Sequence, residues 1–496
     1  MVVLLTTASL EGQHLAKSFF NTGLLGAAGA SAPSDDQFNR VSFLSHFEGS
    51  NNGVNNAFDD GSASNHTITA NGDVTQGSFN PYGTNWAVDF SKDTNPRLSS
   101  PASSDFTLGT GDFTIEFFVF FYTIAGVQKA IKQDIASGGT GFTVATGNGT
   151  GKFTFGGVLS ETTSDAVANK WYHIAITRNS GVFRIFRNGV QTDTDTSSVN
   201  FGSAAKLVYG GSDDLPIKGL MSNLRLVQGT SLYDSNFTTP TSPLTAVTNT
   251  KLLTLQSNRF VDNSASGHAV QPNTGKEAVS AFGPFLSNAV YDPAVNGASA
   301  YFDGSGDALR VSDTASLRIG TGQYTIECWF WFDVLTSNNS GIFAKRDSSS
   351  DYWRILATSS GVNFRINSDV VSDSTVVNKK CWNHIAITRD SNNDNRIYVN
   401  GSLINTISSS VNISNTGTVR LGEFEAGTGP MTGYICDARI VIGTAVYTGS
   451  SLTLPTAPLT AITNTKLLLN MADAQAIDSA AQNNLTLYGN AKISTG

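Results

Sequence analysis

The sequence predicts an all-β protein made of two tandem antiparallel β-sandwiches, and a long internal repeat is the main reason. The phrase Trp-x-His-Ile-Ala-Ile-Thr-Arg occurs at 171–178 and again at 382–389, a spacing of 382 − 171 = 211 residues. Other phrases recur in the same order, among them Asn188-Gly189 and Asn400-Gly401. Solenoid and propeller repeats are much shorter than this, so each copy is expected to be a whole domain with its own core.

The composition agrees with a β-rich fold. Of the 496 residues only 14% are charged, while 48 are glycine and 30 are phenylalanine. An average soluble protein has about 25% charged residues, so the surface here must consist mostly of Ser, Thr, Asn and Gly. Those residues favour turns, and aromatic-rich runs between such turns are typical of antiparallel strands.

The strand patterns show how each sandwich is built. The segments 113–122 and 324–332 are apolar at successive positions, as expected of central strands that are covered on both faces. The segments 184–189 and 396–401 end in Asn-Gly, the strongest local signal for a tight hairpin turn. Each repeat is therefore predicted to be a β-sandwich of antiparallel strands joined by hairpin turns.

Charge and cysteine usage exclude several classes of protein. A net charge of −8 without a Lys/Arg cluster argues against a nucleic-acid partner. The three cysteines, Cys328, Cys381 and Cys436, all lie in the second repeat, so no disulfide belongs to the common fold, which suits a reducing compartment. No Lys or Arg precedes Lys17 and no apolar run approaches the roughly 20 residues that span a bilayer. We expect a soluble protein without membrane insertion.

The repeats divide the chain into a first sandwich at 41–249 and a second at 250–462. Residues 1–40 match neither repeat and are expected to form an N-terminal attachment arm, with a short amphipathic helix at 8–25. The alternative for that arm is a disordered terminus.

A smaller motif that opens each repeat occurs a third time near the C-terminus. Residues 60–66 resemble 262–268, and Asp478-Ser479 repeats their start. Residues 463–496 are therefore expected to be an incomplete third repeat. An isolated strand pair is marginal in water, so it must pack either on the second sandwich of its own chain or on a neighbouring chain by strand addition.

The ordered phrases, repeated twice, resemble the laminin-G-like, concanavalin A-like jelly-roll domain over about residues 41–462. The phrases are Phe-Thr-Ile-Glu, Trp-Tyr-His-Ile-Ala-Ile-Thr-Arg and Phe-Arg-Asn-Gly, followed by Gly219, Arg225, Gly229-Thr230 and Tyr233. The opening strands and the closing Pro-Leu-Thr-Ala phrases are similar to repeats in virion structural proteins of tailed bacteriophages, including those that infect cyanobacteria. The resemblance implies two antiparallel sheets in each repeat and a role in binding or assembly.

From this resemblance we expect a non-enzymatic virion protein, a capsid decoration or a tail or fibre component, assembled in the host cytoplasm. Its partners would be copies of itself, other virion proteins and glycans of the host surface. The alternative is a secreted or cell-surface carbohydrate-binding lectin.

The carboxylates on the central strands do not form a hydrolase pattern. Glycoside hydrolases need two carboxylates facing one cleft, whereas Glu116 and Glu327 are single carboxylates on their strands. We expect each of them to be held by a basic residue such as Arg178 or Arg389.

Two kinds of residue could bind a metal. His173 and His384 are lone histidines in apolar strands and are expected to be hydrogen-bonded core residues. The resemblance implies calcium at the sandwich rim, for which Asp213, Asp214 and Glu423 are the candidates. The alternative is that these three are solvated turn acids.

A glycan site would need aromatic and polar side chains on a loop, because sugar rings stack on aromatic faces. The segment 345–354 offers Asp347, Asp351, Tyr352 and Trp353, whereas the first repeat lacks the aromatic pair. The alternative is that Tyr352 and Trp353 begin a core strand.

Overall fold

A computed structural model describes most of both repeats. The described residues are 67–71, 75–77, 85–91, 95–135, 140–163, 165–202, 205–212, 214–272, 278–280, 293–334, 339–346, 352–358, 361–367, 369–372 and 377–471. The expected attachment arm at 1–40 and the residues after 471 lie outside this part of the chain. No helix in the described ranges is long and apolar enough to cross a membrane.

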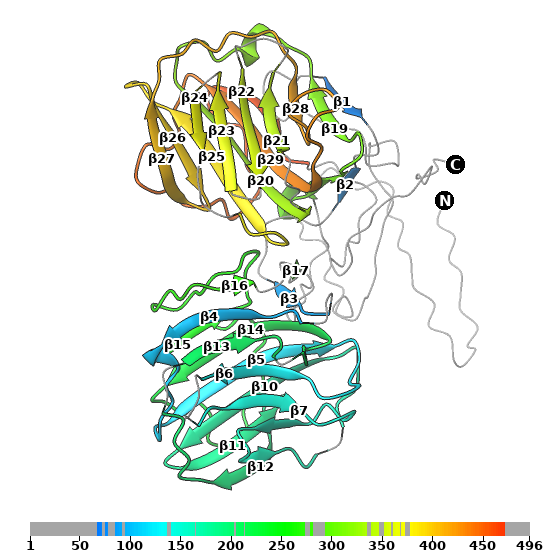
Figure 1. The fold of residues 1–496 in the computed structure, drawn as a ribbon, viewed down its shortest axis with the longest axis vertical. Helices are drawn as coiled ribbons and strands as arrows, with labels where there is room; N and C mark the ends of the chain where they lie inside the picture. Colours follow the sequence, from blue (N-terminus) through cyan, green and yellow to red (C-terminus); the bar gives the residue numbers. More distant parts are fainter. Residues whose placement is uncertain are drawn as a thin grey trace, which may run out of the picture.

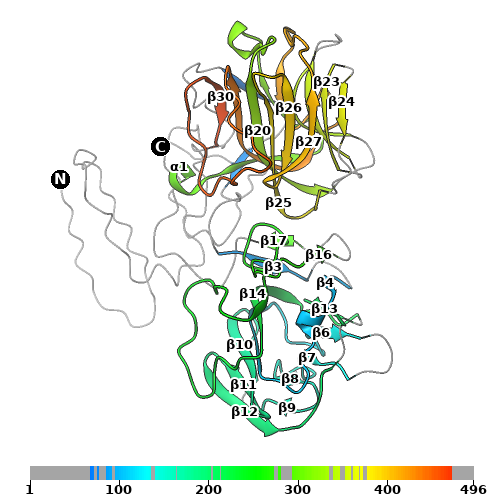
Figure 2. The ribbon, with the colours of Figure 1, turned by 90° about the vertical axis from the view of Figure 1, so that its left-hand side faces the viewer.

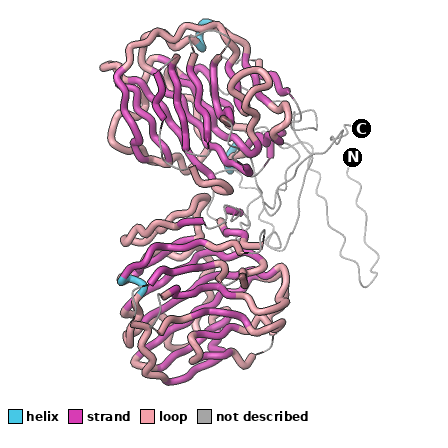
Figure 3. The backbone as a smooth tube through the Cα atoms, viewed as in Figure 1, coloured by secondary structure: helices cyan, strands magenta, loops and turns pink. Residues whose placement is uncertain are grey.

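The described chain forms two β-sandwiches, which confirms the predicted fold class (Figure 1). Among the described residues, strands make up nearly all of the regular structure and helix occurs only as short turns, as Figure 3 shows. Those turns are α1 (Pro293–Asn296), η2 (Ser104–Phe106) and η3 (Ala315–Leu317).

The first sandwich consists of an eight-stranded and a seven-stranded sheet, both antiparallel. The larger follows the order β12-β11-β10-β5-β14-β3-β17 with β15 beside β14, and the smaller follows β16-β4-β13-β6-β7-β8-β9. Their strands are β3 (Ala87–Asp89), β4 (Leu98–Ser103), β5 (Phe113–Phe121), β6 (Lys129–Asp134), β7 (Thr143–Thr146), β8 (Phe153–Phe155), β9 (Leu159–Ser160), β10 (Trp171–Asn179), β11 (Val182–Arg187), β12 (Val190–Thr196), β13 (Ala205–Tyr209), β14 (Gly219–Gln228), β15 (Thr250–Thr254), β16 (Gln271–Pro272) and β17 (Ala278–Ser280).

The second sandwich repeats this plan. Its sheets follow the orders β2-β18-β29-β20-β25-β26-β27, with β30 beside β29, and β1-β19-β28-β21-β22-β23-β24. Their strands are β1 (Ile68–Asn71), β2 (Thr75–Gly77), β18 (Ser299–Asp303), β19 (Ala308–Val311), β20 (Tyr324–Val334), β21 (Ser340–Lys345), β22 (Trp353–Thr358), β23 (Gly361–Ile366), β24 (Asp369–Ser372), β25 (Trp382–Arg389), β26 (Asp394–Val399), β27 (Ser402–Ser408), β28 (Val419–Leu421), β29 (Thr432–Ile442) and β30 (Thr465–Leu469).

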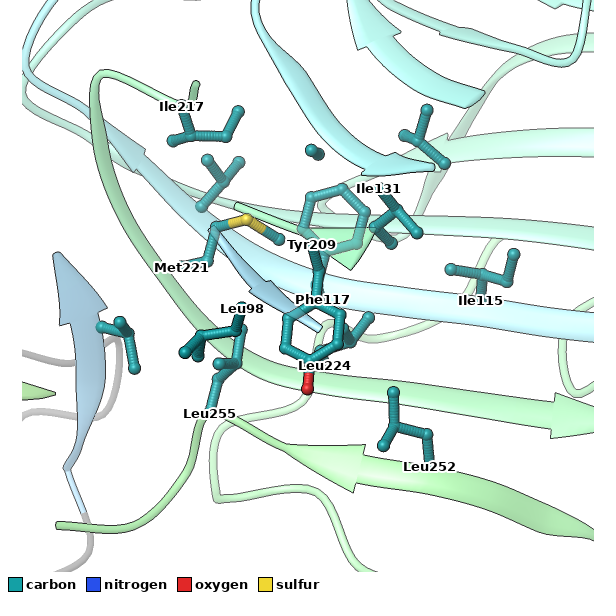
Figure 4. Packing of buried hydrophobic residues seen from close by; sticks show 14 of the residues in the cluster. Leu98, Ile115, Phe117, Ile131, Tyr209, Ile217, Met221, Leu224, Leu252 and Leu255 are labelled. Carbon is teal, nitrogen blue, oxygen red and sulfur yellow. The ribbon is translucent and has the colours of Figure 1, made fainter. Parts of the chain in front are cut away.

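Alternating side chains of the central strands fill each core. In β5, Phe113, Ile115 and Phe117 point into the first sandwich and are fully buried. Figure 4 shows Ile115 and Phe117 packed with Tyr209 and Met221 from the other strands. Burying one such side chain contributes about 1.5–3 kcal/mol, so the cores supply the main stabilisation. The opposite face of β5 is also buried, as predicted for a central strand.

The predicted Asn-Gly turns are confirmed. Asn188 and Gly189 have φ values of 51° and 75°, and Asn400 and Gly401 have 51° and 89°. Two successive positive φ angles define the hairpin turn that matches the twist of the flanking strands. A Cβ at position 189 would lie 2.0 Å from the carbonyl oxygen of Phe237, so glycine is required there for space as well.

The domain boundaries differ from the predicted ones. β15, which begins at the predicted start of the second domain, pairs with β14 and closes the first sandwich. β30 pairs with β29 in the same way, so residues 465–469 pack on the second sandwich of their own chain. The prediction assigned β15 and β30 to the units that follow them, because each comes just before the opening motif. A sequence repeat gives the distance between equivalent residues, but it does not show at which residue one folded unit ends and the next begins.

The strands around the opening motif also cross between the sandwiches. β1 and β2 precede the first sandwich in sequence, yet they pair with β19 and β18 of the second. β16 and β17 precede the second sandwich and pair with β4 and β3 of the first. Figure 2 shows β16 and β17 at the junction between the two sandwiches.

Apolar packing joins the two sandwiches. Trp329, Trp331 and Trp382 belong to the same buried cluster as Phe260, Val279 and the first core. The Trp382 amide donates to the carbonyl of Asn258 over 2.8 Å. The three cysteines are all buried free thiols, in agreement with the absence of a common disulfide.

Candidate functional site

The glutamate of each central strand lies in a buried polar cluster that both sandwiches share. In the first, Arg225 donates from Nε and Nη2 to Oε1 of Glu116 over 2.9 and 2.6 Å. His173 Nε2 and the Tyr233 hydroxyl lie 3.1 and 3.0 Å from Oε2. Both carboxylate oxygens of Glu116, on the outer face of β5, therefore have hydrogen-bond partners.

The second sandwich reproduces the cluster. Arg439 donates to Oε1 of Glu327 over 2.9 and 2.6 Å, and the Tyr447 hydroxyl donates to Oε2 over 2.8 Å. His384 Nε2 lies 3.5 Å from the same Oε2. The histidine is buried in both copies, as predicted, and the predicted hydrogen bond is present in His173.

These contacts make the glutamates structural. Burial alone would raise the pKa of Glu116, but the hydrogen bond from His173 and the charge of Arg225 outweigh it and lower the pKa. Arg225 also donates to the carbonyl of Thr245 over 2.6 Å, so the cluster fastens the segment after β14 across the sheet. An ionised, saturated carboxylate is a poor proton donor for glycoside hydrolysis.

The arginine partner differs from the expected one. Arg178 donates to the carbonyls of Gly109, Val199 and Ser197 rather than to Glu116. Arg389 likewise donates to backbone carbonyls. Sequence proximity to the repeated phrase favoured these arginines, whereas the register of β14 on β5 brings Arg225 opposite Glu116.

Glu423, the calcium candidate of the second sandwich, is held by two arginines. Glu423 is buried and accepts hydrogen bonds from Arg310 Nε over 2.6 Å and from Arg420 Nη1 over 2.7 Å. Burial would raise the pKa of Glu423, but the hydrogen bonds from Arg310, the Gly427 amide and Arg420 lower it. A carboxylate already neutralised by two guanidinium groups does not fit calcium, which needs several free oxygen ligands.

The other two calcium candidates belong to the first sandwich. Asp214 is exposed, and Asp213 lies outside the described residues. Within the described ranges, no three His, Cys, Asp or Glu side chains are grouped as metal ligands.

The predicted glycan residues are divided between the core and the surface. Trp353 begins β22 and is only 1% exposed, so it is a core residue, which confirms the alternative and corrects its assignment to a sugar-stacking loop. Tyr352 remains half-buried at the surface. Asp347 and Asp351 lie outside the described residues.

Sequence reasoning missed a row of arginines next to Tyr352. Cross-strand pairing places Arg310 opposite Arg420, and Arg420 opposite Ala344. Ala344 lies opposite Arg354, which in turn lies opposite Arg365. We call Arg310, Arg420, Arg354 and Arg365 the arginine row.

The arginine row crosses β19, β28, β21, β22 and β23 on the outer face of their sheet. Directly paired residues share a face, and the flanking Leu309, Ile355 and Phe364 all point into the core. Figure 1 shows β21, β22 and β23 side by side in the upper sandwich. Adjacent strands are about 4.8 Å apart, so the row extends over roughly 19 Å.

The two ends of the row differ in charge balance. Glu423 neutralises Arg310 and Arg420 at one end. At the other end, no carboxylate of the described residues forms an ion pair with Arg354 or Arg365. Burial is the main cause that lowers the pKa of Arg354; the neighbouring Arg346 and Arg365 lower it further, whereas Tyr352 and Glu425 act in the opposite direction. The arrangement therefore holds a surplus of positive charge that a bound anion would relieve.

Aromatic rings hold the arginines in place. The guanidinium groups of Arg346 and Arg354 lie 4.9 and 5.3 Å from the ring centroid of Tyr352. Phe424 packs against the same two groups at 5.9 and 5.0 Å and rests on the buried Leu356. Such cation–π contacts stabilise each cation by about 0.5–1 kcal/mol at exposed sites.

The row is particular to the second sandwich. The matching row in the first runs through Ser99, Val208, Lys132 and Thr143 and contains one cation. Counting the described residues only, with Arg346 and the partners Glu423 and Glu425, the second sandwich has five cations and two anions here, 5 − 2 = +3, in a chain whose net charge is −8. In sequence, the only signal was an arginine at an outward position of four of the five strands.

Comparison with known proteins identifies the fold family. A family model described as "Concanavalin A-like lectin/glucanases superfamily" matches residues 92–231 and 303–444. No curated protein matches the chain by sequence.

Solved structures resemble the chain at low identity. Domains LG4-5 of the mouse laminin α1 chain are 12% identical, with a TM-score of 0.26, covering 76% of this chain and 96% of that one. Domain 4 of the arabinanase AbnA from Geobacillus stearothermophilus, solved with arabinotriose, is 19% identical with a TM-score of 0.26 (32% and 72% covered). The CBM40 of a Ruminococcus gnavus sialidase is 16% identical with a TM-score of 0.21 (25% and 81% covered).

The two ranges matched by the family model together cover more than half of the 496 residues, and each falls within one sandwich. The chain therefore belongs to the concanavalin A-like lectin/glucanase superfamily, as two tandem laminin-G-like domains.

Proposed function

We propose that this chain is a non-enzymatic carbohydrate-binding protein whose second sandwich binds an acidic polysaccharide across the arginine row. Membership of a lectin/glucanase superfamily suggests carbohydrate binding in general. The observation that carries the more specific proposal is the direct pairing of Arg354 with Arg365 on adjacent strands, beside Arg346.

The chemistry of the row fits an anionic sugar. Guanidinium groups bind carboxylate or sulfate oxygens through two parallel hydrogen bonds, and they lose less on leaving water than an ammonium group does. The ring of Tyr352 lies beside the guanidinium groups of Arg346 and Arg354 and holds them in place. A linear polymer with regularly spaced anions can contact Arg354 and Arg365 at the same time. The second contact then strengthens binding, because the polymer has already lost its translational freedom in making the first.

The test is a pair of polymers that differ only in charge. The purified full chain is titrated with dextran sulfate and with unmodified dextran of the same length, by calorimetry at two salt concentrations. We expect saturable binding of dextran sulfate that weakens as salt rises, because mobile ions screen exposed charges. Equal binding of both polymers, or of neither, would contradict an acidic-glycan site.

The biological setting is a further part of the proposal. The likeness of the opening strands and closing phrases to tailed-bacteriophage repeats supports a virion component that decorates the capsid or forms part of a tail or fibre. Its partners would then be other virion proteins and copies of itself, with the arginine row available to host-surface glycans. Quantitative mass spectrometry of purified particles, compared with particle-free lysate, tests this: a fixed number of copies per particle is expected.

The alternative, a secreted or cell-surface lectin, predicts a different distribution. The chain would then occur in the medium or on the producing cell, and not in particles. The same mass-spectrometric comparison separates the two, while the carbohydrate titration is independent of both.

A further inference from the structure

The turn between β28 and β29 places a second carboxylate, that of Glu425, beside the arginine row. The amide of Thr428 donates to the carbonyl of Glu425 over 2.8 Å, and the amide of Phe424 donates to the carbonyl of Thr428 over 3.3 Å. The amide of Gly427 donates to Oε2 of the buried Glu423 over 2.9 Å. The turn is therefore fixed to the sheet by hydrogen bonds, and these set the position of Glu425.

Phe424 holds the same turn against the outer face of the sheet. It is 7% exposed and forms a small buried cluster with Ala344 of β21 and Leu356 of β22. The guanidinium groups of Arg346 and Arg354 pack on its ring. Glu425 is the next residue in the chain, so the turn brings its carboxylate to these two cations.

Glu425 and Arg346 form a loose ion pair. Nη1 of Arg346 lies 3.4 Å from Oε2 of Glu425, and the two side chains are 24% and 35% exposed. Glu423, by contrast, is buried and accepts hydrogen bonds of 2.6 and 2.7 Å from its two arginines. A partly exposed pair contributes little to stability, whereas breaking a buried one is costly. Another anion can therefore replace Glu425 but not Glu423.

The charge of Glu425 also reaches Arg354. Burial lowers the pKa of Arg354, and Glu425 acts in the opposite direction. The Nε groups of Arg346 and Arg354 are buried, and neither donates to an acceptor within the described part of the chain. Guanidinium groups hold an anion best through two parallel hydrogen bonds. Glu425 thus balances positive charge here but leaves donor groups that a ligand anion can use.

The turn that carries Glu425 is longer than its counterpart in the first sandwich. The amide of Met431 donates to the carbonyl of Gly422 over 2.9 Å, and the amide of Ile217 donates to that of Gly210 over 2.9 Å. Gly422 and Gly210 each follow the equivalent strand and share a φ of 84°. The closed loops span 431 − 422 = 9 and 217 − 210 = 7 positions, so the second sandwich has two extra residues. The longer turn and the arginine row occur together in one sandwich.

We propose that Glu425 regulates the arginine row as an internal competitor for Arg346, an inference that rests on the proposed binding of an acidic polysaccharide. In the unbound chain the carboxylate of Glu425 balances Arg346, and a bound polymer replaces it with one of its own anions. A polymer with few anions gains too little from Arg354 and Arg365 to displace Glu425. The turn therefore restricts the site to strongly charged polymers.

The affinity for dextran sulfate of the full-length Glu425→Gln variant tests this role. Calorimetry is expected to show binding about two- to fivefold tighter than that of the unaltered chain, the range covered by a partly exposed ion pair. The matched control is Asp165→Asn in the first sandwich, which removes a carboxylate from a pair with Lys152 at 3.3 Å. The control should leave the affinity unchanged. Equal tightening in both variants would be an effect of net charge and would overturn the proposal.

A double-variant cycle separates competition from simple repulsion of the ligand. Glu425→Gln is introduced into the unaltered chain and into a chain that carries Arg346→Gln. If Glu425 acts by occupying Arg346, its removal has no effect on affinity once Arg346 is absent. The same tightening in both backgrounds would show general repulsion and would also overturn the proposal. Thermal melting of each variant verifies that it is folded.

Failure of this inference and failure of the proposed function give different results. If Glu425→Gln and the unaltered chain bound dextran sulfate equally, binding at the arginine row would stand and the competitor role would be wrong. If neither bound it, the proposed function itself would be wrong, and the competitor role with it.

Discussion

Arg354 and Arg365 lie directly opposite each other on β22 and β23, and both side chains face away from the core. Like charges at directly opposed positions destabilise a sheet by about 0.2–1 kcal/mol relative to a neutral pair. Tyr352 and Phe424 partly offset this cost by stacking on Arg354. Residues that oppose folding in this way are typical of binding sites, where a ligand supplies the missing charge.

The buried glutamate clusters are predicted to be essential for stability. Replacing Glu116 by Gln leaves the guanidinium group of Arg225 buried without its carboxylate, which typically costs about 3–5 kcal/mol. Urea unfolding of the full chain measures the loss. Because the folded pKa of Glu116 is lowered, its contribution is present above the ordinary glutamate pKa and is lost as the pH falls through the folded value.

The Glu425→Gln variant provides the control for that experiment. It removes the same charge from a partly exposed ion pair with Arg346, and such pairs contribute about 0–1 kcal/mol. Similar losses for Glu116→Gln and Glu425→Gln would contradict the role assigned to the buried cluster.

Asp437 is predicted to weaken the second sandwich at neutral and alkaline pH. Burial raises the pKa of Asp437 to about 8, whereas its ordinary value is 3.8. Between these values the folded state holds a proton that the unfolded state has lost, so stability falls by up to about 1.4 kcal/mol per pH unit as the pH rises.

The first sandwich has an uncharged residue at the position of Asp437. Asn223 occupies this position with the same φ of 51°. Asn223 accepts a hydrogen bond from the Leu244 amide over 2.8 Å without titrating. Asp437→Asn is expected to raise the melting temperature, and to raise it more at pH 8 than at pH 5. A pH-independent shift would count against a buried, protonated Asp437.

The Asn-Gly turn provides a stability test with a matched control. Gly189 and Gly181 both have positive φ, 75° and 83°. A Cβ at position 189 meets the Phe237 carbonyl oxygen at 2.0 Å, whereas a Cβ at 181 meets its nearest atom at 3.7 Å. Gly181→Ala is expected to cost about 1 kcal/mol from backbone strain alone. Gly189→Ala should cost clearly more in the same denaturant titration, and equal costs would contradict the close packing of residue 237.

Calcium is not expected to stabilise the second sandwich through Glu423. Its carboxylate is neutralised by Arg310 and Arg420, so millimolar calcium or a chelator should leave the melting temperature unchanged. A ligand that binds only the folded state raises the melting temperature. If calcium raised the melting temperature of the unaltered chain but not of the Glu423→Gln variant, Glu423 would bind calcium in place of the two arginines, and this prediction would be wrong.

The sequence was sufficient for the fold and for part of the buried chemistry. The repeated Trp-x-His-Ile-Ala-Ile-Thr-Arg phrase and the Asn-Gly turns predicted two sandwiches, because strand periodicity and turn residues are local properties. The same locality explains why His173 was correctly placed in the core.

Features that depend on register could not be predicted. Arg225 meets Glu116, and Arg354 meets Arg365, only because strands distant in sequence pair in one register. Trp353 offered a plausible sugar-stacking ring, yet the pleat of β22 points its side chain into the core. The docking of β1 on the second sandwich is also set by pairing between segments more than two hundred residues apart.

The most direct test of the carbohydrate-binding claim is the affinity for dextran sulfate of the full-length double variant Arg354→Thr/Arg365→Thr. Threonine is the residue of the first sandwich at the position of Arg354. The control is Lys206→Thr/Lys218→Thr, which removes two positive charges from the first sandwich. We expect the arginine variant to lose at least about tenfold in affinity, since each charge-assisted hydrogen bond contributes about 1.5–3 kcal/mol. The control should retain the affinity, and equal affinities of both variants and the unaltered chain would contradict the account.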